Sequence, residues 1–148
     1  MLDTIFSATN ALAMIGWAGL ILLPGRRFVV QVLARVLIPV VIAVVYISLM
    51  VGHVGSSPEG GGFGSLAGVA TLFTVDGLLL AGWIHYLAFD LFVGSWEVTD
   101  SRKEGIPHLF LVPCLVLTFM AGPAGLAVYF AIKYGRRALA SEAAEQSP

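Results

Sequence analysis

The sequence predicts an all-α integral membrane protein with about four transmembrane helices, the fourth kinked or broken at Gly122–Pro123. Hydrophobic residues make up 58% of the 148 residues and charged residues only 11%. A soluble domain carries roughly 25% charged residues, so this chain has too little polar surface to cover a water-soluble particle. Its apolar residues also fall into blocks long enough to cross a bilayer, which strand-length runs are not.

The first three blocks are expected at about residues 5–23, 29 or 36 to 51, and 75–96. No Lys or Arg precedes the first block, so it is expected to be a retained helix and not a cleaved signal peptide. The second block is rich in Val and Ile, but in lipid the backbone must bond to itself, which favours a helix. Residues 52–64 are rich in Gly and Ser and predict a loop.

The fourth block runs from Pro107 to about Ile132 and is interrupted by Pro113 and by the Gly122–Pro123 pair. A proline inside a membrane helix removes one backbone hydrogen bond and usually kinks or breaks the helix. We therefore expect one transmembrane domain over residues 1–140, with a flexible tail at 141–148.

The distribution of positive charge bears on orientation. Arg26, Arg27 and Arg35 follow the first block, Arg102 and Lys103 follow the third, and the second loop has no Lys or Arg. By the positive-inside rule this pattern favours an outside N-terminus. Three more positive charges after the fourth block contradict this orientation unless the break at 122–123 turns the chain back. The net charge of −1 gives no reason to expect a nucleic-acid partner.

Polar side chains at membrane depth are concentrated in the third block. Asp76 and Asp90 are candidates for function because an ionised Asp at the centre of a span costs roughly 2.5–3.5 kcal/mol. Asp76, Trp83, Asp90 and Glu97 are each seven residues apart, so they are expected along one stripe of the helix. Such a stripe also allows a proton or ion pathway.

His85 is expected well off this stripe. Phe89, Phe92 and Trp96 follow it at helical spacing and form an aromatic face around it. A buried histidine and carboxylic acid, such as His85 and Asp90, are candidates for acid–base chemistry.

Each candidate also has a structural explanation. Asp76 suits a helix N-terminus, Trp83 and Trp96 suit a membrane interface, and His85 can hydrogen-bond to a neighbouring helix. Asp90 has the weakest structural explanation, because no Lys or Arg occurs between residues 36 and 101. Neither metal-ligand spacing nor a nucleotide-binding motif is found, so we expect no metal and no cofactor.

The third and fourth blocks resemble the abscisic-acid-deficient-four-like family of small membrane proteins. The resemblance rests on the run from Trp83 to Trp96 with its Phe-Asp-Leu-Phe-x-Gly-x-Trp core, on Gly105-Ile106-Pro107, and on the Gly-Pro-Ala-Gly break at 122–125. It covers about residues 73–134, and more loosely the first two helices. Plant members of this family are needed to make neoxanthin.

The resemblance implies a neoxanthin synthase-like isomerase in the cell (inner) membrane whose ligand is a carotenoid or another long isoprenoid. In the plant reaction an epoxide opens and an allene forms, which requires an acid and a base but no redox change. The resemblance suggests His85 and Asp90, with Asp76 nearby, as catalytic residues. Its aromatic ligand-binding residues would be Trp83, Phe89, Phe92 and Trp96.

The alternative is a non-catalytic accessory or assembly subunit of a membrane pigment–protein complex. The enzyme hypothesis predicts a cavity beside His85 and Asp90. The accessory hypothesis predicts that hydrogen bonds between helices, or a partner chain, fill both positions. A homo-oligomer and membership of a larger complex both remain open.

Overall fold

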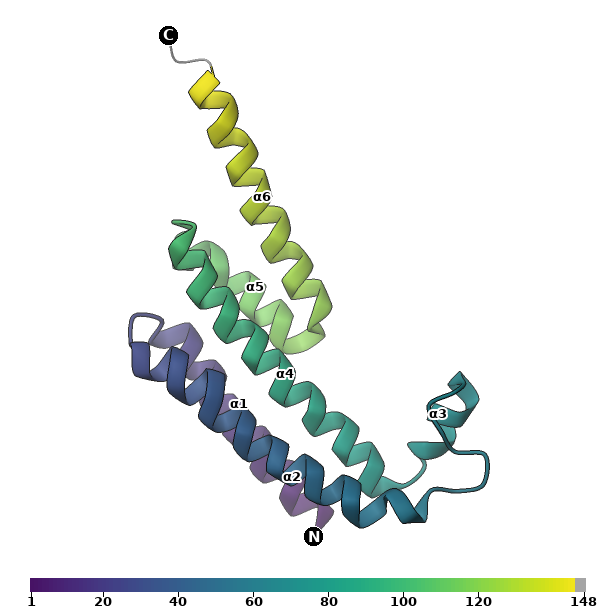
Figure 1. The fold of residues 1–148 in the computed structure, drawn as a ribbon. Helices are drawn as coiled ribbons and strands as arrows, with labels where there is room; N and C mark the ends of the chain where they lie inside the picture. Colours follow the sequence, from purple (N-terminus) through teal and green to yellow (C-terminus); the bar gives the residue numbers. More distant parts are fainter. Residues whose placement is uncertain (146–148) are drawn as a thin grey trace.

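The computed structural model describes the backbone of residues 1–145 and the side chains of residues 1–142. Over this range the chain is helical and contains no strand, which confirms the all-α prediction. Figure 1 shows a tilted bundle with one long helix projecting from it. The elements in order are α1 (Leu2–Leu22), η1 (Phe28–Leu37), α2 (Ile38–His53), η2 (Val54–Ser56), α3 (Leu66–Leu72), α4 (Asp76–Lys103), α5 (His108–Ala121) and α6 (Pro123–Glu145).

Three helices in this range are long and apolar enough to cross a membrane, and they match the first three predicted blocks. They are Leu2–Leu22, the continuous run Phe28–Ser56, and Asp76–Lys103. Helix α4 lies at the centre and contacts α1, α2 and α5 (Figure 1). At Gly94 a Cβ would lie 2.7 Å from the ring of Trp17 on α1, so the missing side chain is what allows these helices to pack closely.

The second span begins with η1, a ten-residue π-helix, which is wider than an α-helix. Residues of η1 bond to the fifth preceding carbonyl, as the Ile38 N–H does to the Leu33 oxygen. Pro39 follows and has no N–H to offer a normal helical bond. Wide helical turns of this kind are uncommon and often occur at functional sites.

The fourth block does not cross as one helix. Helix α5 runs through Pro113 without interruption but has only 14 residues, about 21 Å, against a hydrocarbon core of about 30 Å. It ends at Gly122, whose φ of +20° is unfavourable for other residues. Pro123 then starts α6, as proline suits the first position of a helix. The predicted break at Gly122–Pro123 is confirmed, and it forms a reversal of the chain.

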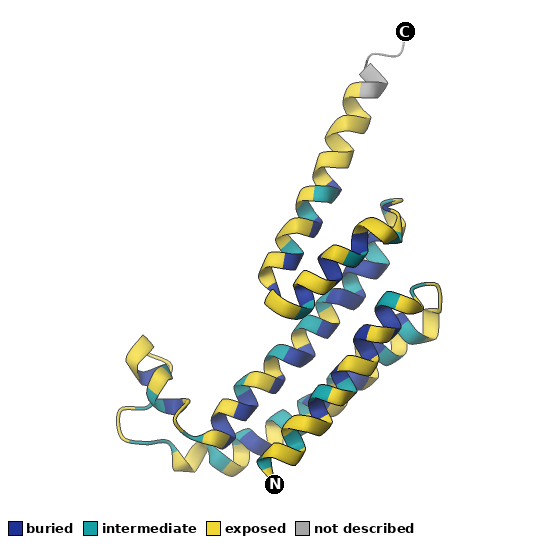
Figure 2. Cartoon of the chain, turned by 180° about the vertical axis from the view of Figure 1, so that it is seen from behind, coloured by how far each residue is buried: buried dark blue, intermediate teal, exposed yellow. Residues whose placement is uncertain are grey.

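Helix α6 runs back beside α5 and along the C-terminal half of α4 (Figure 1). Contacts fix this direction: Tyr129 and Lys133 bind Asp100, and Arg137 binds Glu104. The tip of the α5–α6 hairpin reaches only the middle of α4, at Asp90. The helix continues through Glu145, into the tail expected at 141–148, and residues 146–148 lie outside the described range. Its later turns are exposed, as Figure 2 shows.

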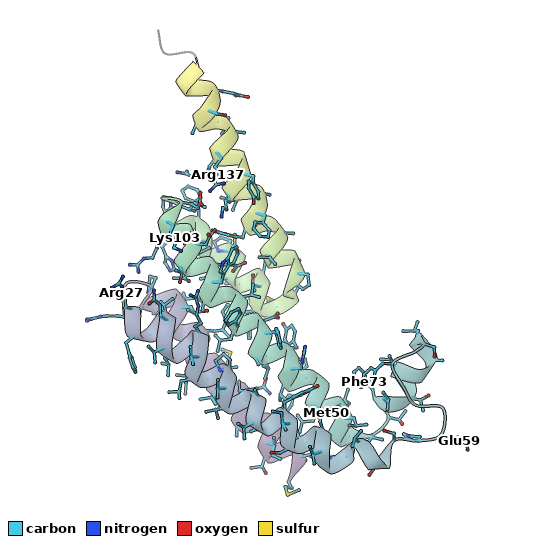
Figure 3. The ribbon with its side chains drawn as sticks, in the orientation of Figure 1. Arg27, Met50, Glu59, Phe73, Lys103 and Arg137 are labelled. Atoms are coloured by element: carbon cyan, nitrogen blue, oxygen red, sulfur yellow. The ribbon has the colours of Figure 1, made fainter. Side chains whose placement is uncertain are left out.

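Because α6 returns, every Lys and Arg of the chain lies at one end of the bundle. Figure 3 labels Arg27, Lys103 and Arg137 there, whereas Glu59 and Phe73 lie at the other end. By the positive-inside rule we expect this end in the cytoplasm and the N-terminus on the opposite side. The conflict in the sequence-based orientation disappears, since three spans and a returning hairpin leave both charge groups on one side. The eight residues are Arg26, Arg27, Arg35, Arg102, Lys103, Lys133, Arg136 and Arg137.

Candidate functional site

The candidate residues on α4 lie on different faces of the helix. His85 and Asp90 are five positions apart, which places them about 140° apart around the axis. His85 faces α2, whereas Asp90 faces the hairpin tip. The structure therefore does not bring the two together, and each belongs to a different environment.

His85 borders an apolar cavity of about 420 Å³ between α2, α4, α3 and the glycine-rich segment before α3. The His85 ring stacks on Phe89 with 4.6 Å between ring centroids, and the Tyr46 ring lies 5.6 Å from His85. Tyr46, Ser57 and His85 supply the polar side chains of the lining. Apolar residues from three elements make up most of the rest, among them Met50, Phe63, Leu72, Phe73 and Leu78.

The glycine-rich loop is packed over this cavity. The Gly62 N–H donates to the Gly68 carbonyl at 3.1 Å, and Ser65 caps α3 by accepting the Gly68 N–H at 3.0 Å. A Cβ at Gly68 would lie 2.8 Å from the Gly62 oxygen, so the loop approaches α3 closely because residue 68 is glycine. The segment predicted as a loop thus forms, with α3, a cover for the cavity.

Phe89 and Phe92 line a second apolar groove, of about 320 Å³, between α2 and α4. Arg35 closes one end of this groove. Its Nε donates to the Ser95 hydroxyl at 3.1 Å, and its Nη2 donates to the Ser95 carbonyl at 2.9 Å and the Thr99 hydroxyl at 3.1 Å. The guanidinium is thereby fixed against α4.

Asp90 lies against the hairpin tip. A Cβ at Gly122 would be 2.7 Å from Asp90 Oδ1, so only glycine allows this approach. Oδ2 of Asp90 is buried and has no hydrogen-bond partner among the described residues. Tyr86, one turn earlier on α4, donates its hydroxyl to the Phe119 carbonyl near the end of α5.

Glu97 lies two turns further along the same face and is completely buried. The Thr118 hydroxyl on α5 lies 3.0 and 3.2 Å from the two carboxyl oxygens. Burying a carboxyl group is costly unless it is hydrogen-bonded, so the Thr118 hydroxyl offsets part of that cost. The sequence prediction that Glu97 shares a stripe with Asp90 agrees with this arrangement.

Beyond Glu97, the same side of α4 forms an ion-pair ladder with α6. The Tyr129 hydroxyl donates to Asp100 at 2.6 Å, and Lys133 lies 2.5 Å from Asp100 and 3.3 Å from Glu104. Arg137 donates two hydrogen bonds to Glu104, at 2.6 and 2.8 Å. The hydrogen bond from Arg137 is the main reason why the pKa of Glu104 lies below its ordinary value.

Trp96 packs against this ladder. Its ring meets Tyr129 edge-on at 5.6 Å, and Lys133 lies 5.9 Å from the ring centroid. Sequence reasoning missed the ladder because it depends on the return of α6. A signal was present in the matched spacing, since Asp100 and Glu104 are four residues apart, as are Lys133 and Arg137.

Asp76 and Trp83 lie at the opposite end of α4. Asp76 is exposed in the first turn, where a negative charge suits the helix dipole, and Val75 precedes it as the cap residue. The Trp83 indole donates to Asn10 on α1 at 3.3 Å, and its ring lies 5.9 Å from Phe6. Both candidates line a wide recess near the N-terminus, away from His85 and Asp90.

No group of three or more His, Cys, Asp or Glu residues that could hold a metal ion occurs within the described part of the chain. What the geometry offers chemically is two titratable side chains, His85 and Tyr46, with 5.6 Å between their ring centroids, on a cavity suited to an apolar ligand. It also offers two shielded carboxyl groups, Asp90 and Glu97, beneath a hairpin.

Comparison with known proteins identifies a family. Residues 4–129 match the family model described as ABA DEFICIENT 4-like, which covers 126 of the 148 residues. No curated protein and no solved structure matches the chain.

Proposed function

Because the chain belongs to the ABA DEFICIENT 4-like family, we propose that it is a membrane isomerase acting on a carotenoid or related isoprenoid. The ligand's end group is held in the cavity beside His85. The observation that carries this proposal is the apolar cavity of about 420 Å³ with His85 and Tyr46 on its wall. Ligand sites of this kind are mostly apolar and carry a small number of placed polar groups.

The cavity suits a bulky apolar end group. Phe63, Leu72 and Phe73 lie on the side of the cover, and Met50 and Leu78 lie on α2 and α4. The cover formed by α3 and the glycine-rich loop supplies one wall of the cavity, and the exposed side chain of Phe63 lies on that wall.

The chemistry needs only two proton transfers. His85 removes a proton from a C–H group beside a strained C–O ring, and those electrons form a new C=C bond while the ring C–O bond breaks. The Tyr46 hydroxyl gives its proton to the departing oxygen, which becomes an alcohol. The protonated His85 then returns a proton to Tyr46, so the protein is regenerated. Positioned proton transfer typically contributes 10²–10⁴-fold to a rate.

The proposal changes the role suggested for Asp90. A ligand end group seated against His85 and Tyr46 faces α2, whereas Asp90 lies under the hairpin tip. We therefore pair His85 with Tyr46 and place Asp90 outside the reacting groups, against the hairpin tip.

One observation favours the accessory-subunit alternative. That hypothesis expects His85 and Asp90 to be filled by hydrogen bonds between helices or by a partner chain, and the carboxyl group of Asp90 does lie against the α5–α6 hairpin, although its Oδ2 has no hydrogen-bond partner among the described residues. The cavity beside His85 supports the enzyme instead, because the alternative expects that position to be filled.

The proposal is tested by expressing the chain in membranes that contain an epoxide-bearing carotenoid and separating the pigments by chromatography. We expect conversion to an isomer of unchanged mass, and a loss of about 100-fold or more in His85→Phe and Tyr46→Phe. Tyr134→Phe is the matched control, because Tyr134 is exposed on α6, and it should retain full activity. Undiminished conversion by His85→Phe would refute the assignment.

A further inference from the structure

The end of the bundle that carries the Lys and Arg residues holds cations that form no ion pair with a carboxylate among the side chains of residues 1–142. The ion pairs found among the described side chains are those of Lys133 and Arg137 with Asp100 and Glu104. These two acids face α6 and are already occupied. Arg27, Arg35, Arg102 and Lys103 take part in none of these pairs.

Three of these four cations surround a small polar pit. It has a volume of about 200 Å³ and is lined by Arg27, Val30, Gln31, Thr99, Arg102 and Lys103. The pit lies where η1 meets the last turns of α4. Its size and donors suit a compact anion such as a phosphate ester, for which arginine and lysine are the usual partners.

The fourth cation, Arg35, connects the pit to the apolar groove. Thr99 lines the pit and accepts a hydrogen bond from Arg35 Nη2. Arg35 in turn closes the groove formed by Pro39, Val40, Ala43, Ala88, Phe89 and Phe92. A polar, cationic pocket is thus joined through one arginine to an apolar groove that faces lipid.

Arg35 has no anionic partner among the described side chains. Its Nε and Nη2 are used by Ser95 and Thr99, which are neutral, while the side chain is only partly exposed at the edge of the hydrocarbon region. Charged groups within membrane proteins are costly unless paired. A carotenoid has no charge to offer, so the proposed substrate does not meet this need.

We propose that this end of the chain binds an anionic phospholipid from the surrounding bilayer, with its phosphate in the pit and one acyl chain in the groove beside Phe89 and Phe92. Charge complementarity selects the headgroup, and the connection through Arg35 selects a ligand with an apolar chain. The cytoplasmic leaflet is where anionic lipids are enriched. The site does not depend on the activity proposed at His85.

The experiment measures lipid binding to the purified full chain in neutral detergent by native mass spectrometry and thermal unfolding. Phosphatidylglycerol is compared with phosphatidylcholine of the same acyl chains. We expect phosphatidylglycerol to bind more tightly and to raise the unfolding temperature more. Equal effects of the two lipids would overturn the proposal.

The variants are matched for charge. Arg27→Gln combined with Lys103→Gln removes two exposed cations of the pit and should weaken phosphatidylglycerol binding about tenfold or more. Arg26→Gln combined with Arg136→Gln removes two exposed cations that do not line the pit and should weaken binding less than about threefold. Equal losses in both double variants would mean diffuse attraction and would overturn the site.

Two further experiments distinguish a bound lipid from a bound free anion. Ala43→Phe narrows the apolar groove and should weaken long-chain phosphatidylglycerol while leaving the pit intact. Inorganic phosphate should stabilise the chain much less than the lipid does. If phosphate stabilises it equally and Ala43→Phe has no effect, the pit is an anion site and the lipid proposal fails.

Discussion

The two sides of α4 use polar residues in opposite ways. On the side facing the hairpin, Glu97 is held by Thr118, Asp100 by Tyr129 and Lys133, and Glu104 by Arg137. On the side facing α2, His85 is exposed beside a cavity and Arg35 is fixed without a carboxylate partner. The difference suggests that one side stabilises the fold and the other binds ligands. If the side facing the hairpin stabilises the fold, substitutions there should change the free energy of unfolding.

The largest effect is expected where the hairpin is tightest. A Cβ at Gly125 would lie 2.1 Å from the Thr118 backbone nitrogen and 2.2 Å from its hydroxyl, so α5 and α6 would have to move apart. Overpacking of this kind costs typically about 1–3 kcal/mol, and we expect Gly125→Ala to lie at the upper end. Thermal unfolding in detergent measures this cost.

Gly135 is the matched control on the same helix. No atom lies within 4 Å of the position of its Cβ, and α6 is a regular helix there. Gly135→Ala should therefore be neutral or stabilise by about 0.5–1 kcal/mol, because alanine suits a helix interior better. If Gly125→Ala and Gly135→Ala change the unfolding temperature equally, close packing between α5 and α6 does not stabilise the hairpin.

A smaller effect is expected at Tyr129, which is completely buried and donates a 2.6 Å hydrogen bond to Asp100. Tyr129→Phe keeps the ring against Trp96 and removes the hydroxyl. We expect a loss near the lower end of about 1.5–3 kcal/mol, the usual range for a hydrogen bond to a charged group. The activity proposed at His85 should persist in the folded variant. A loss of that activity with unchanged stability would contradict the separation of a stabilising side of α4 from a ligand-binding side.

The smallest effect is expected at Glu104, outside the membrane-spanning segments. The hydrogen bond from Arg137 holds the pKa of Glu104 below its ordinary value, so the folded state prefers the ionised acid. The contribution of Glu104 to stability is therefore complete above the pKa of a free glutamate, about 4.3. It is lost as the pH falls through the lower pKa of the folded state.

Glu104→Gln removes this dependence. The difference in unfolding temperature between the natural chain and the variant should be small at pH 7, because Arg137 is 56% exposed. It should shrink further below about pH 4 and in high salt. A difference that grows as the pH falls would contradict the assigned direction.

The sequence predicted the three spans and the break at Gly122–Pro123, because hydrophobic length and backbone chemistry are local properties. The positive charges after the fourth block left open that the chain turns back at residues 122–123. The path of α6 along α4 could not be predicted, because it depends on pairing between Asp100 and Lys133, which lie far apart in the chain. The faces of His85 and Asp90 followed from helical spacing, but which neighbour covers each face did not. The sequence also did not predict that the glycine-rich segment and α3 line the cavity beside His85, because glycine has no side chain that indicates what the segment packs against.

The half-crossing hairpin also bears on how the chain is made. Once the first three helices are inserted, the cationic α6 lies on the side where synthesis takes place. We expect that no part of the chain after Lys103 has to be exported across the bilayer. A reporter domain fused after Pro148 should accordingly mature in the cytoplasm, whatever its own ability to pass through the translocation machinery.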